Sequence, residues 1–524
     1  MKKIIYNIKK TLHIVAILLA SMALTTACTN DLNTEEIGPN VEEDPYASAD
    51  KYPILLAKIY AGFSRIGLTG PDGDGDIPSS SDQGKTNFLR IYFNMQELTS
   101  DEAKCAWNDN DEKNYSQTLL TPDNSIGYMF YQRCMTNIAF ANEFIRRTNT
   151  PLVEVNDLDR MRAEARVLRA LNYYFLLDLV GNPGWITDQH PIDGSYKPQQ
   201  IGRTALFEWI ETELKAVLEE GKLKDYSAAT YGMATNQMVQ TILAKLYINA
   251  EVYTGTPRWQ DALTYAKLVN NHSALELEDN YQNLFCADNH KSNEIIFALT
   301  YDYNRARDWG GIKFIMASSS AGDMVGDAIN FTESWAGNRA TQQLTNLFSS
   351  SDNRALFFTD ERTKDMDNLS DFKSGWSVQK FTNRAWDGAA NPNKTVEWPD
   401  TDFPMFRLAD VILIQAEAEL RLNDNNAVNT FNKVYAHART GLTKKNSITL
   451  QDILDERGRE LYWEAHRRTD LIRFGKFATG YNWAWKGGVK DGKDIDKKYE
   501  LFPLSTRHLT GNTDLEQTEL YRNK

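Results

Sequence analysis

The chain has 524 residues, and its 71 Asp and Glu against 58 Lys and Arg give a net charge of −13. This length is ample for a large buried core, built as one big domain or two intimate ones. A chain this acidic repels nucleic acid and anionic lipid head groups, so nucleic-acid binding is excluded and neutral ligands are favoured.

The N-terminus has the order of a secretory signal. Four lysines lead into an apolar stretch over residues 12–24, and small residues then run up to Cys28. Residues 1–27 are predicted to be a signal peptide, because the apolar stretch is too short and one-sided for a bilayer-spanning helix. The small residues before Cys28 indicate lipoprotein processing, in which its sulfur is acylated. Thr25 stands where lipoproteins usually carry an aliphatic residue, so plain secretion stays the alternative.

Residues 28–46 form a polar, acidic tether between the predicted lipid and the folded domain. Asp31, Glu35 and Glu36 follow soon after Cys28 and resemble the export signal of surface-exposed lipoproteins. No later run of about 18 apolar residues occurs, so no further segment is predicted to cross a membrane. We therefore expect a protein of the outer membrane that is held by a lipid anchor and faces the cell exterior.

Helical periodicity dominates the domain predicted for residues 47–524. In the segment 159–180, Met161, Ala165 and Leu168 recur at helical spacing, and the Gly and Pro of residues 181–184 stop the helix. Adjacent amphipathic helices with short turns are typical of tetratricopeptide-like repeats, although the strict period of about 34 residues is absent. We expect a mostly α fold, in which such helical repeats support a loop-rich ligand-binding face. The predicted helices cover residues 52–66, 127–148, 159–180, 203–220, 235–253, 258–270, 408–422, 426–439 and 450–474.

The middle of the domain has a different character. Residues 276–405 are rich in Asn, Asp, Ser, Gly and Trp and have few helical stripes. A structured, loop-rich region of this size usually carries function. The domain is therefore divided into a helical scaffold at 47–275 and 406–475, a loop-rich ligand region at 276–405 and a C-terminal segment at 476–524. Thr449, with Asp452 three residues on, is predicted to cap the last scaffold helix.

Little in the sequence indicates a cofactor. Apart from the predicted acylation site, Cys105, Cys134 and Cys286 are odd in number and lack a CxxC spacing. This pattern argues against a zinc site or a disulfide framework and leaves one disulfide open. The alternating aspartates of residues 72–76 are not followed by the Gly and Glu that an EF-hand needs. We expect no cofactor, with a structural calcium ion near residues 288–294 as the alternative.

Four segments, spread over most of the chain, resemble the SusD/RagB family. They are EARVLRALNYYFLLDLVG at 164–181, PMFRLADVILIQAEAEL at 404–420, ERGRELYWEAHRRTDLIRFG at 456–475 and LFPL at 501–504. The resemblance implies an α-helical fold with tetratricopeptide-like units beneath a loop-rich ligand face. It also implies a non-enzymatic surface lipoprotein that captures oligosaccharides or polysaccharides and passes them to a SusC-like TonB-dependent transporter.

Charged residues in the third of these segments lie at helical spacing and are interpreted as structural ion pairs rather than a catalytic site. The pairs expected are Glu456 with Arg459, Glu464 with Arg468 and Arg467 with Asp470.

Within the family, the chain most resembles its starch-binding founder, which makes starch or a related α-glucan the expected ligand. In that kind of site aromatic rings cover the C–H faces of sugars and polar groups bond the hydroxyls. Trp309 stands where the family site has a tyrosine, and Cys105 replaces a second tryptophan, so a thinner aromatic arc is expected. Most tryptophans belong to protein cores, as we expect for Trp463. The residues that match the site are Asp82, Arg90, Trp107, Asn110, Trp309 and Trp335.

Three alternatives stay open. In the first, the ligand is another glycan, such as mucin or a host N-glycan. In the second, the helical repeats bind only proteins, and in the third the chain is a surface glycoside hydrolase. A hydrolase needs two carboxylates about 5 to 10 Å apart, and acids are too abundant in the sequence to exclude such a pair. No HExxH, GxSxG, Walker or GxGxxG motif with suitable context supports an enzyme.

Overall fold

The computed structural model describes residues 44–78, 82–191, 196–321, 329–393 and 397–522. The predicted signal peptide, Cys28 and the tether up to residue 43 lie outside these ranges. The described residues divide into a small unit, at 44–52 and 151–155, and a main unit, within 53–150 and 156–522.

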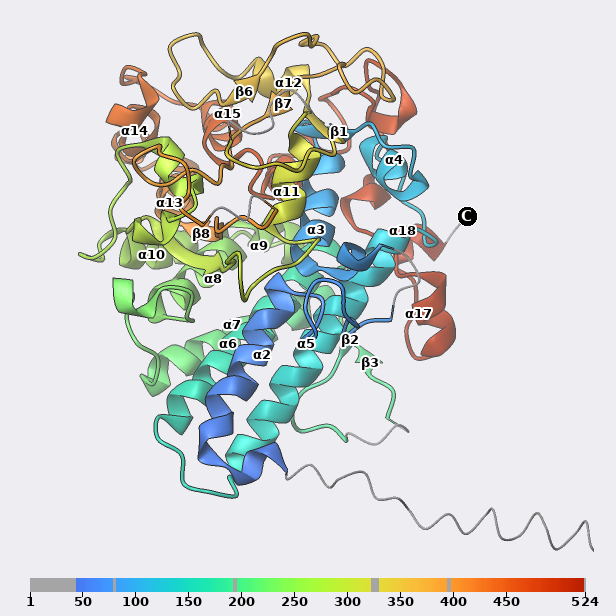
Figure 1. Ribbon diagram of the computed structural model, residues 1–524, viewed down its shortest axis with the longest axis vertical. Helices are drawn as coiled ribbons and strands as arrows, with labels where there is room; N and C mark the ends of the chain where they lie inside the picture. Colours follow the sequence, from blue (N-terminus) through green and yellow to red (C-terminus); the bar gives the residue numbers. More distant parts are fainter. Residues whose placement is uncertain (1–43, 79–81, 192–195, 322–328, 394–396, 523–524) are drawn as a thin grey trace, which may run out of the picture. The chain divides into compact units, whose positions relative to one another are not determined.

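Helices dominate the main unit, as predicted (Figure 1). The α-helices are α2 (Tyr52–Ser64), α3 (Phe88–Phe93), α4 (Asn110–Ser116), α5 (Ser125–Asn149), α6 (Leu158–Leu179), α7 (Arg203–Glu220), α8 (Asn236–Ile248), α9 (Ala250–Thr254), α10 (Trp259–Asn270), α11 (Ile312–Ser319), α12 (Gln342–Thr345), α13 (Leu408–Arg421), α14 (Ala427–Tyr435), α15 (Leu450–Leu461), α16 (Arg467–Arg473), α17 (Thr506–Gly511) and α18 (Glu519–Arg522).

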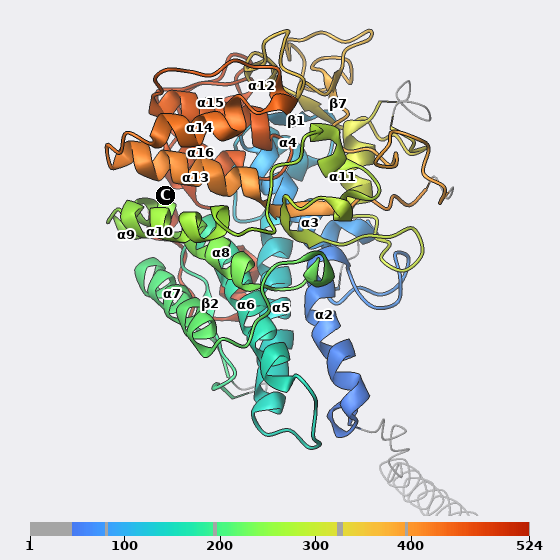
Figure 2. The same cartoon turned by 90° about the vertical axis from the view of Figure 1, so that its left-hand side faces the viewer.

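Successive helices pack on one another, as in tetratricopeptide-like repeats. Helix α5 packs on α6, α6 on α7, α8 on α10, α10 on α13 and α13 on α14 (Figure 2). Ala163, Ala165 and Ala170 of α6 are buried, and their small side chains let neighbouring helices approach closely. The predicted fold class, mostly α with tetratricopeptide-like packing, is therefore confirmed.

Short antiparallel ladders join distant parts of the chain. The pairing of β4 with β8 brings the two ends of the loop-rich region together, directly before α13. The pairing of β1 with β5 places Cys105 opposite Asn338. The region also holds the buried helix α11, where the sequence showed few helical stripes. The strands are β1 (Ala103–Cys105), β2 (Gly184–Trp185), β3 (Gln199–Gln200), β4 (Ile295–Leu299), β5 (Asn338–Ala340), β6 (Phe357–Phe358), β7 (Ser377–Val378) and β8 (Phe403–Arg407).

The prediction of one helix over residues 450–474 is wrong. The segment divides into α15 and α16, and in the turn between them Trp463 and Ala465 adopt φ angles of 64° and 61°. Left-handed angles are unfavourable for residues with a Cβ atom. The backbone N–H groups of Trp463 and Ala465 donate to the buried carboxylates of Glu102 (3.3 Å) and Glu97 (2.7 Å). These distant acceptors hold a turn that local sequence disfavours.

Other helix boundaries follow the prediction more closely. The expected helix at 235–253 is interrupted at Asn249 between α8 and α9, and the helix expected at 426–439 ends at Tyr435. The capping box of Thr449 and Asp452 is present at the start of α15. Trp463 is fully buried and donates from its indole to the hydroxyl of Ser319 at 2.7 Å, which confirms its place in the core.

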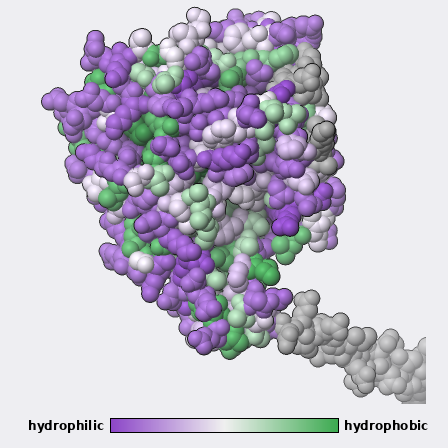
Figure 3. All heavy atoms as spheres, turned by 60° about the vertical axis from the view of Figure 1, so that its left-hand side comes forward, coloured by the Kyte–Doolittle hydropathy of each residue, from purple (hydrophilic) through white to green (hydrophobic). Residues whose placement is uncertain are grey.

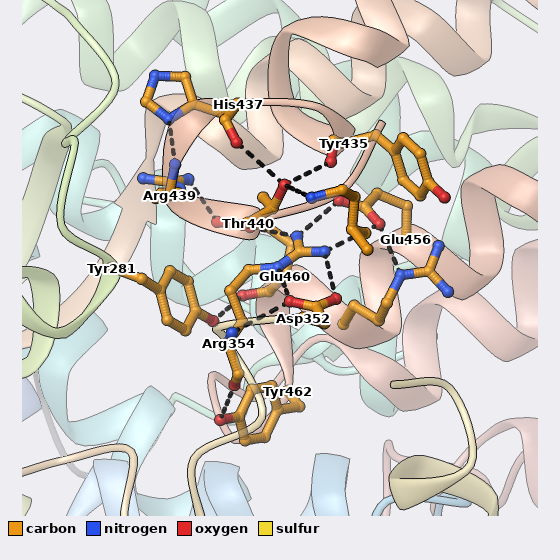
Figure 4. Close-up of polar contacts among 12 residues, drawn as sticks. Tyr281, Asp352, Arg354, Tyr435, His437, Arg439, Thr440, Glu456, Glu460 and Tyr462 are labelled. Carbon is orange, nitrogen blue, oxygen red and sulfur yellow. Dashed lines mark hydrogen bonds and ion pairs between the residues drawn. The ribbon is translucent and has the colours of Figure 1, made fainter. Parts of the chain in front are cut away.

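A buried ion-pair network links the loop-rich region to α15 (Figure 4). The carboxylate of Glu460 lies within 2.8 Å of guanidinium nitrogens of Arg354, Arg407 and Arg439. Glu294, which precedes β4, pairs with Arg407 and Arg439 as well. These side chains are at most 1% exposed. The network therefore ties the end of β8 and the start of β4 to a scaffold helix.

Several ion-pair partners of the charged residues in the segment 456–475 differ from those predicted, although their structural interpretation holds. Glu456 pairs with Arg459 at 2.8 Å, as expected. In place of the expected pairs of Glu464 with Arg468 and of Arg467 with Asp470, Glu464 pairs with Lys380 (2.7 Å) and Arg407 (2.6 Å), Arg467 with Asp101 (2.7 Å), and Asp470 with Arg457 (2.7 Å) and Arg473 (2.8 Å).

Glu460 makes part of the stability depend on pH. Burial alone raises the pKa of its carboxyl group, but Arg439, Arg407 and Arg354 lower that pKa well below the ordinary value of 4.5. An acidic group whose pKa is lower in the folded than in the unfolded state stabilises the fold fully at a pH above its unfolded-state pKa. This stabilisation is lost progressively as the pH falls from the unfolded-state pKa towards the folded-state pKa. We expect the free energy of unfolding, measured by urea titration, to fall as the pH drops below about 4.5. A Glu460→Gln variant is expected to show a shallower fall, and an equal slope in both proteins would contradict this assignment.

Cys105, Cys134 and Cys286 are free, buried thiols. Burial raises the pKa of Cys105 and Cys286 to about 12, so both stay protonated and unreactive. The disulfide that the sequence left open is therefore not formed. Within the described ranges, no group of three or more His, Cys, Asp or Glu side chains is arranged to hold a metal ion.

The C-terminal segment is bound to the scaffold by backbone contacts. The N–H of Phe502 donates to the carbonyl oxygen of Leu179 at 2.8 Å. The side-chain amide of Gln517 both accepts from and donates to the backbone of Leu504. The closing segment that resembles the family is thus fixed to the end of α6.

The face shown in Figure 3 is mostly hydrophilic, with apolar residues scattered over it. Exposed apolar side chains, such as those of Leu268 and Leu422, are ordinary on a protein surface. Within the residue ranges given above, every helix is too short or too polar to span a bilayer.

Candidate functional site

The structure brings five of the six predicted ligand residues to one hollow of about 420 Å³. We call it the tryptophan hollow. Asn110 is the exception, because it begins α4 as an exposed residue beside the lining and is not part of it. The hollow is lined by Asp82, Lys85, Arg90, Trp107, Asp109, Trp309 and Trp335.

Two half-buried indoles form the aromatic part of the hollow. The ring centroids of Trp309 and Trp335 lie 6.5 Å apart, and their planes are inclined by 29°. The Trp335 N–H donates to the carboxylate of Glu333 at 3.0 Å, and the Trp309 N–H donates to Asp72 at 2.8 Å. Each ring edge is thus fixed by a hydrogen bond, and the part of each ring that lines the hollow is the apolar surface that a ligand can meet.

Trp107 is positioned by the β1–β5 ladder. Its indole N–H donates to the backbone carbonyl of Trp335 at 3.0 Å. A Cβ atom at Gly337 would lie only 2.3 Å from the Trp107 ring, so the ring packs directly on glycine backbone. The Trp107 ring also meets Phe314 of α11 at 6.1 Å between centroids. The third indole is therefore held from both sides.

The loop that carries Trp309 is anchored by Asp308, which is buried. Its carboxylate accepts the backbone N–H groups of Ile66 and Gly310 and the side-chain N–H of Asn87, all within 2.9 Å. Gly84 and Gly310 also touch backbone to backbone, since a Cβ at Gly84 would lie 2.7 Å from the Gly310 nitrogen. Residues far apart in the sequence thus fix the position of one ring.

Ion pairs form the polar rim. Arg90 on α3 pairs with Asp82 at 2.6 Å and lies over the Phe314 ring at 4.7 Å. Lys85 and Asp109 face each other at 3.6 Å. Burial raises the pKa of the Asp82 carboxyl group, but Arg90 and the Gly84 N–H outweigh this effect and lower it below its ordinary value. Asp82 is therefore an ionised acceptor at neutral pH, which suits hydroxyl recognition and not the role of a general acid.

Comparison with known proteins assigns the chain to a protein family. The model of the SusD family matches residues 327–521. The starch-binding protein SusD of Bacteroides thetaiotaomicron is 30% identical over 98% of this chain and 99% of its own length. This chain belongs to the SusD family. A SusD-like protein of Bacteroides ovatus is 28% identical over 68% of each chain.

Solved structures of SusD-like architecture agree on the fold. Surface glycan-binding protein A from Bacteroides thetaiotaomicron, in complex with laminarihexaose, has a TM-score of 0.68 at 18% identity and covers 89% of this chain and 99% of its own. The protein of the same name from Bacteroides fluxus has a TM-score of 0.70 at 19% identity and covers 90% of this chain and 99% of its own. At these identities the likeness shows a shared SusD fold and nothing more.

Sequence reasoning missed two residues that back the hollow in this SusD-family chain. Trp398 is 6% exposed, and its ring lies 4.9 Å from that of Trp309 at 63°. The ammonium of Lys313, on α11, lies 3.7 Å from the Trp309 ring centroid and 4.0 Å from that of Trp398. Burial lowers the pKa of Lys313 below its ordinary value, and the carboxylates of Glu333 and Glu397, 3.6 and 3.7 Å away, offset this lowering only in part. No sequence signal pointed to Lys313, because its helix lies in a region assigned to loops.

Lys313 is expected to position the Trp309 ring for ligand binding. A cation over indole faces stabilises the arrangement by about 0.5 to 2 kcal/mol, more when water is excluded. A Lys313→Met variant is therefore expected to bind glycan several-fold more weakly, with a shifted tryptophan emission spectrum. Isothermal titration and fluorescence measure both effects. Lys313→Arg keeps the cation and should retain most of the affinity, so equal losses in both variants would refute this role.

Proposed function

We propose that the chain is a non-enzymatic, cell-surface glycan-binding protein that captures oligosaccharides at the tryptophan hollow. The observation that carries the proposal is the convergence of Trp107, Trp309 and Trp335 with the Asp82–Arg90 pair at one hollow. Rings meet the C–H faces of sugars, and the ion pair bonds hydroxyls at the rim. Membership of the SusD family supports the same function.

The ligand proposed is starch or a related α-glucan. The relative named for starch binding aligns over nearly the whole chain. The 29° inclination of the Trp309 and Trp335 rings presents a bent surface, which suits a curved glucan better than a flat ribbon. The alternative is another glycan, such as mucin or a host N-glycan.

We further propose that the captured glycan passes to a SusC-like TonB-dependent transporter in the outer membrane. The family resemblance supports this partnership, as does the acidic, lipoprotein-like N-terminus with Cys28. Co-purification of the transporter with this chain from solubilised outer membranes is the test, and recovery of the chain alone would contradict the partnership.

Binding assays with a catalytic control test the proposed function. Isothermal titration of the protein with maltooligosaccharides, laminarioligosaccharides and mucin glycans should give saturable binding to one series. A reducing-end assay with the same glycans should give no product. Release of reducing ends would establish a hydrolase, and absence of binding to every glycan would favour a protein-binding scaffold.

Cys28 is expected to carry the membrane anchor. A Cys28→Ala variant should move from the membrane to the soluble fraction and lose palmitate labelling, because acylation of the sulfur supplies the buried hydrocarbon. Fractionation and labelling of cells measure the change. Binding of the soluble variant to glycan should be unaltered. A Cys28→Ala protein that stays membrane-bound would exclude the lipid anchor.

A further inference from the structure

A second hollow of about 430 Å³ lies between residues 280–286 and 379–388. We call it the Trp386 pocket. It shares no lining residue with the tryptophan hollow. Its walls carry side-chain amides, the half-buried indole of Trp386 and one residue of each charge, Arg384 and Asp387. Opposite charges in equal number leave the pocket suited to an uncharged ligand.

Trp386 stands on a short hairpin with a fixed backbone. Residues Arg384 and Ala390 form an antiparallel bridge, and the N–H of Ala385 donates to the carbonyl of Ala389 at 2.9 Å. Gly388 takes a φ of 80° at the tip, which a residue with a side chain rarely adopts. The backbone N–H of Trp386 donates to Asp288 at 2.6 Å. The indole is therefore carried by a rigid element, as a stacking platform requires.

The amides of the pocket are oriented by bonds to the backbone. The Nε2 atom of Gln282 donates to the carbonyl of Lys380 at 2.7 Å, and that of Gln379 donates to the carbonyl of Phe357 at 3.3 Å. An amide whose nitrogen is bound in this way has its carbonyl oxygen fixed on the opposite side. Both glutamines line the pocket, so each can offer an oriented acceptor to a hydroxyl group there.

We infer that the Trp386 pocket is a second carbohydrate-binding site, which takes one or two sugar units of the polysaccharide held at the tryptophan hollow. The indole of Trp386 covers a C–H face, the oxygens of Gln282 and Gln379 accept hydroxyl protons, and the guanidinium of Arg384 donates. This inference rests on the proposed glycan-binding function for the class of its ligand. A weak second site increases retention of a long chain, because the second contact is intramolecular.

The inference predicts a difference between polymer and short oligosaccharide. Affinity electrophoresis through gels with amylopectin, laminarin or mucin identifies the polymer that retains the protein. On that polymer, Trp386→Ala should weaken retention about threefold to tenfold. In isothermal titration, the Trp386→Ala variant should bind the matching hexasaccharide or heptasaccharide with an affinity within twofold of that of the parent protein, because a short ligand occupies only the tryptophan hollow. Trp386→Phe keeps a ring face and should restore most of the retention, and Gln379→Leu should lower it without loss of the indole.

The arms of this experiment separate the two proposals. Phe372→Ala removes an exposed aromatic side chain outside both hollows and should change nothing. If Trp309→Ala lowers retention but Trp386→Ala and Gln379→Leu do not, the second site is refuted and the proposed function stands. If the parent protein is retained by none of the three polymers, both proposals fall. Melting temperatures of all variants show whether a loss of retention reflects unfolding.

Discussion

A Glu460→Gln variant is expected to be destabilised by about 3 to 5 kcal/mol. The substitution keeps the size of the side chain but removes the charge that three buried guanidinium groups share. Arg354, Arg407 and Arg439 lie within 2.8 Å of the Glu460 carboxylate. The three arginines keep other carboxylate partners, but the network loses one negative charge and is left with an unbalanced positive charge where water cannot reach it. The midpoint of urea unfolding at pH 7 measures the effect.

Glu516→Gln provides a matched control. Glu516 pairs with Arg522 at 2.6 Å, but its side chain is 65% exposed. Exposed pairs contribute from about 0 to 1 kcal/mol, because water solvates both partners once the pair is broken. The two variants make the same chemical change at a buried and an exposed site. Similar midpoints for both would show that the buried network contributes little to stability.

The network matters for the candidate site because of what it joins. Glu460 lies on α15 of the scaffold, whereas Arg407 ends β8 and Glu294 precedes β4, at the two ends of the loop-rich region. These contacts fix where the region enters and leaves the scaffold. The loops between them carry Trp309 and Trp335, so scaffold stability and site geometry are coupled through few residues.

Local sequence was sufficient where local interactions decide the structure. The periodic apolar residues of α6 and the capping box of Thr449 and Asp452 were predicted correctly, because both depend on residues a few positions apart. The break between α15 and α16 was not predicted, because the carboxyl groups that accept from the Trp463 and Ala465 N–H groups lie more than 360 residues away in the chain.

The same distinction applies to the site. Trp107, Trp309 and Trp335 were predicted through the family resemblance, and the structure brings them to one hollow. Lys313 was not predicted, although it lies only four residues after Trp309, because its helix α11 falls in a region that the sequence assigned to loops. Trp398 was not predicted either, because it becomes a partner of Trp309 and Lys313 only after the segment around residue 398 has packed on α11. A contact between residues 85 positions apart leaves no local pattern in a single sequence.

Trp309→Ala is expected to have the largest effect on glycan binding. Trp309 faces Trp335 across the hollow at 6.5 Å and also packs on the two side chains behind it, Trp398 at 4.9 Å and the Lys313 ammonium at 3.7 Å. The variant loses a stacking face and also leaves Lys313 with one ring instead of two. We expect a loss of at least about 1 kcal/mol, which corresponds to a fivefold or greater rise in Kd by isothermal titration.

Two further variants assign the cause of that loss. Trp309→Phe keeps a ring face but not the N–H donated to Asp72, and it should bind with an intermediate Kd. Asp72→Asn keeps an acceptor for the indole and should bind like the parent. If the ring itself meets the sugar, Kd should rise from the parent to Trp309→Phe and again to Trp309→Ala, because the phenyl ring keeps part of the stacking face and alanine keeps none. An unchanged Kd in Trp309→Ala would place the glycan elsewhere on the molecule.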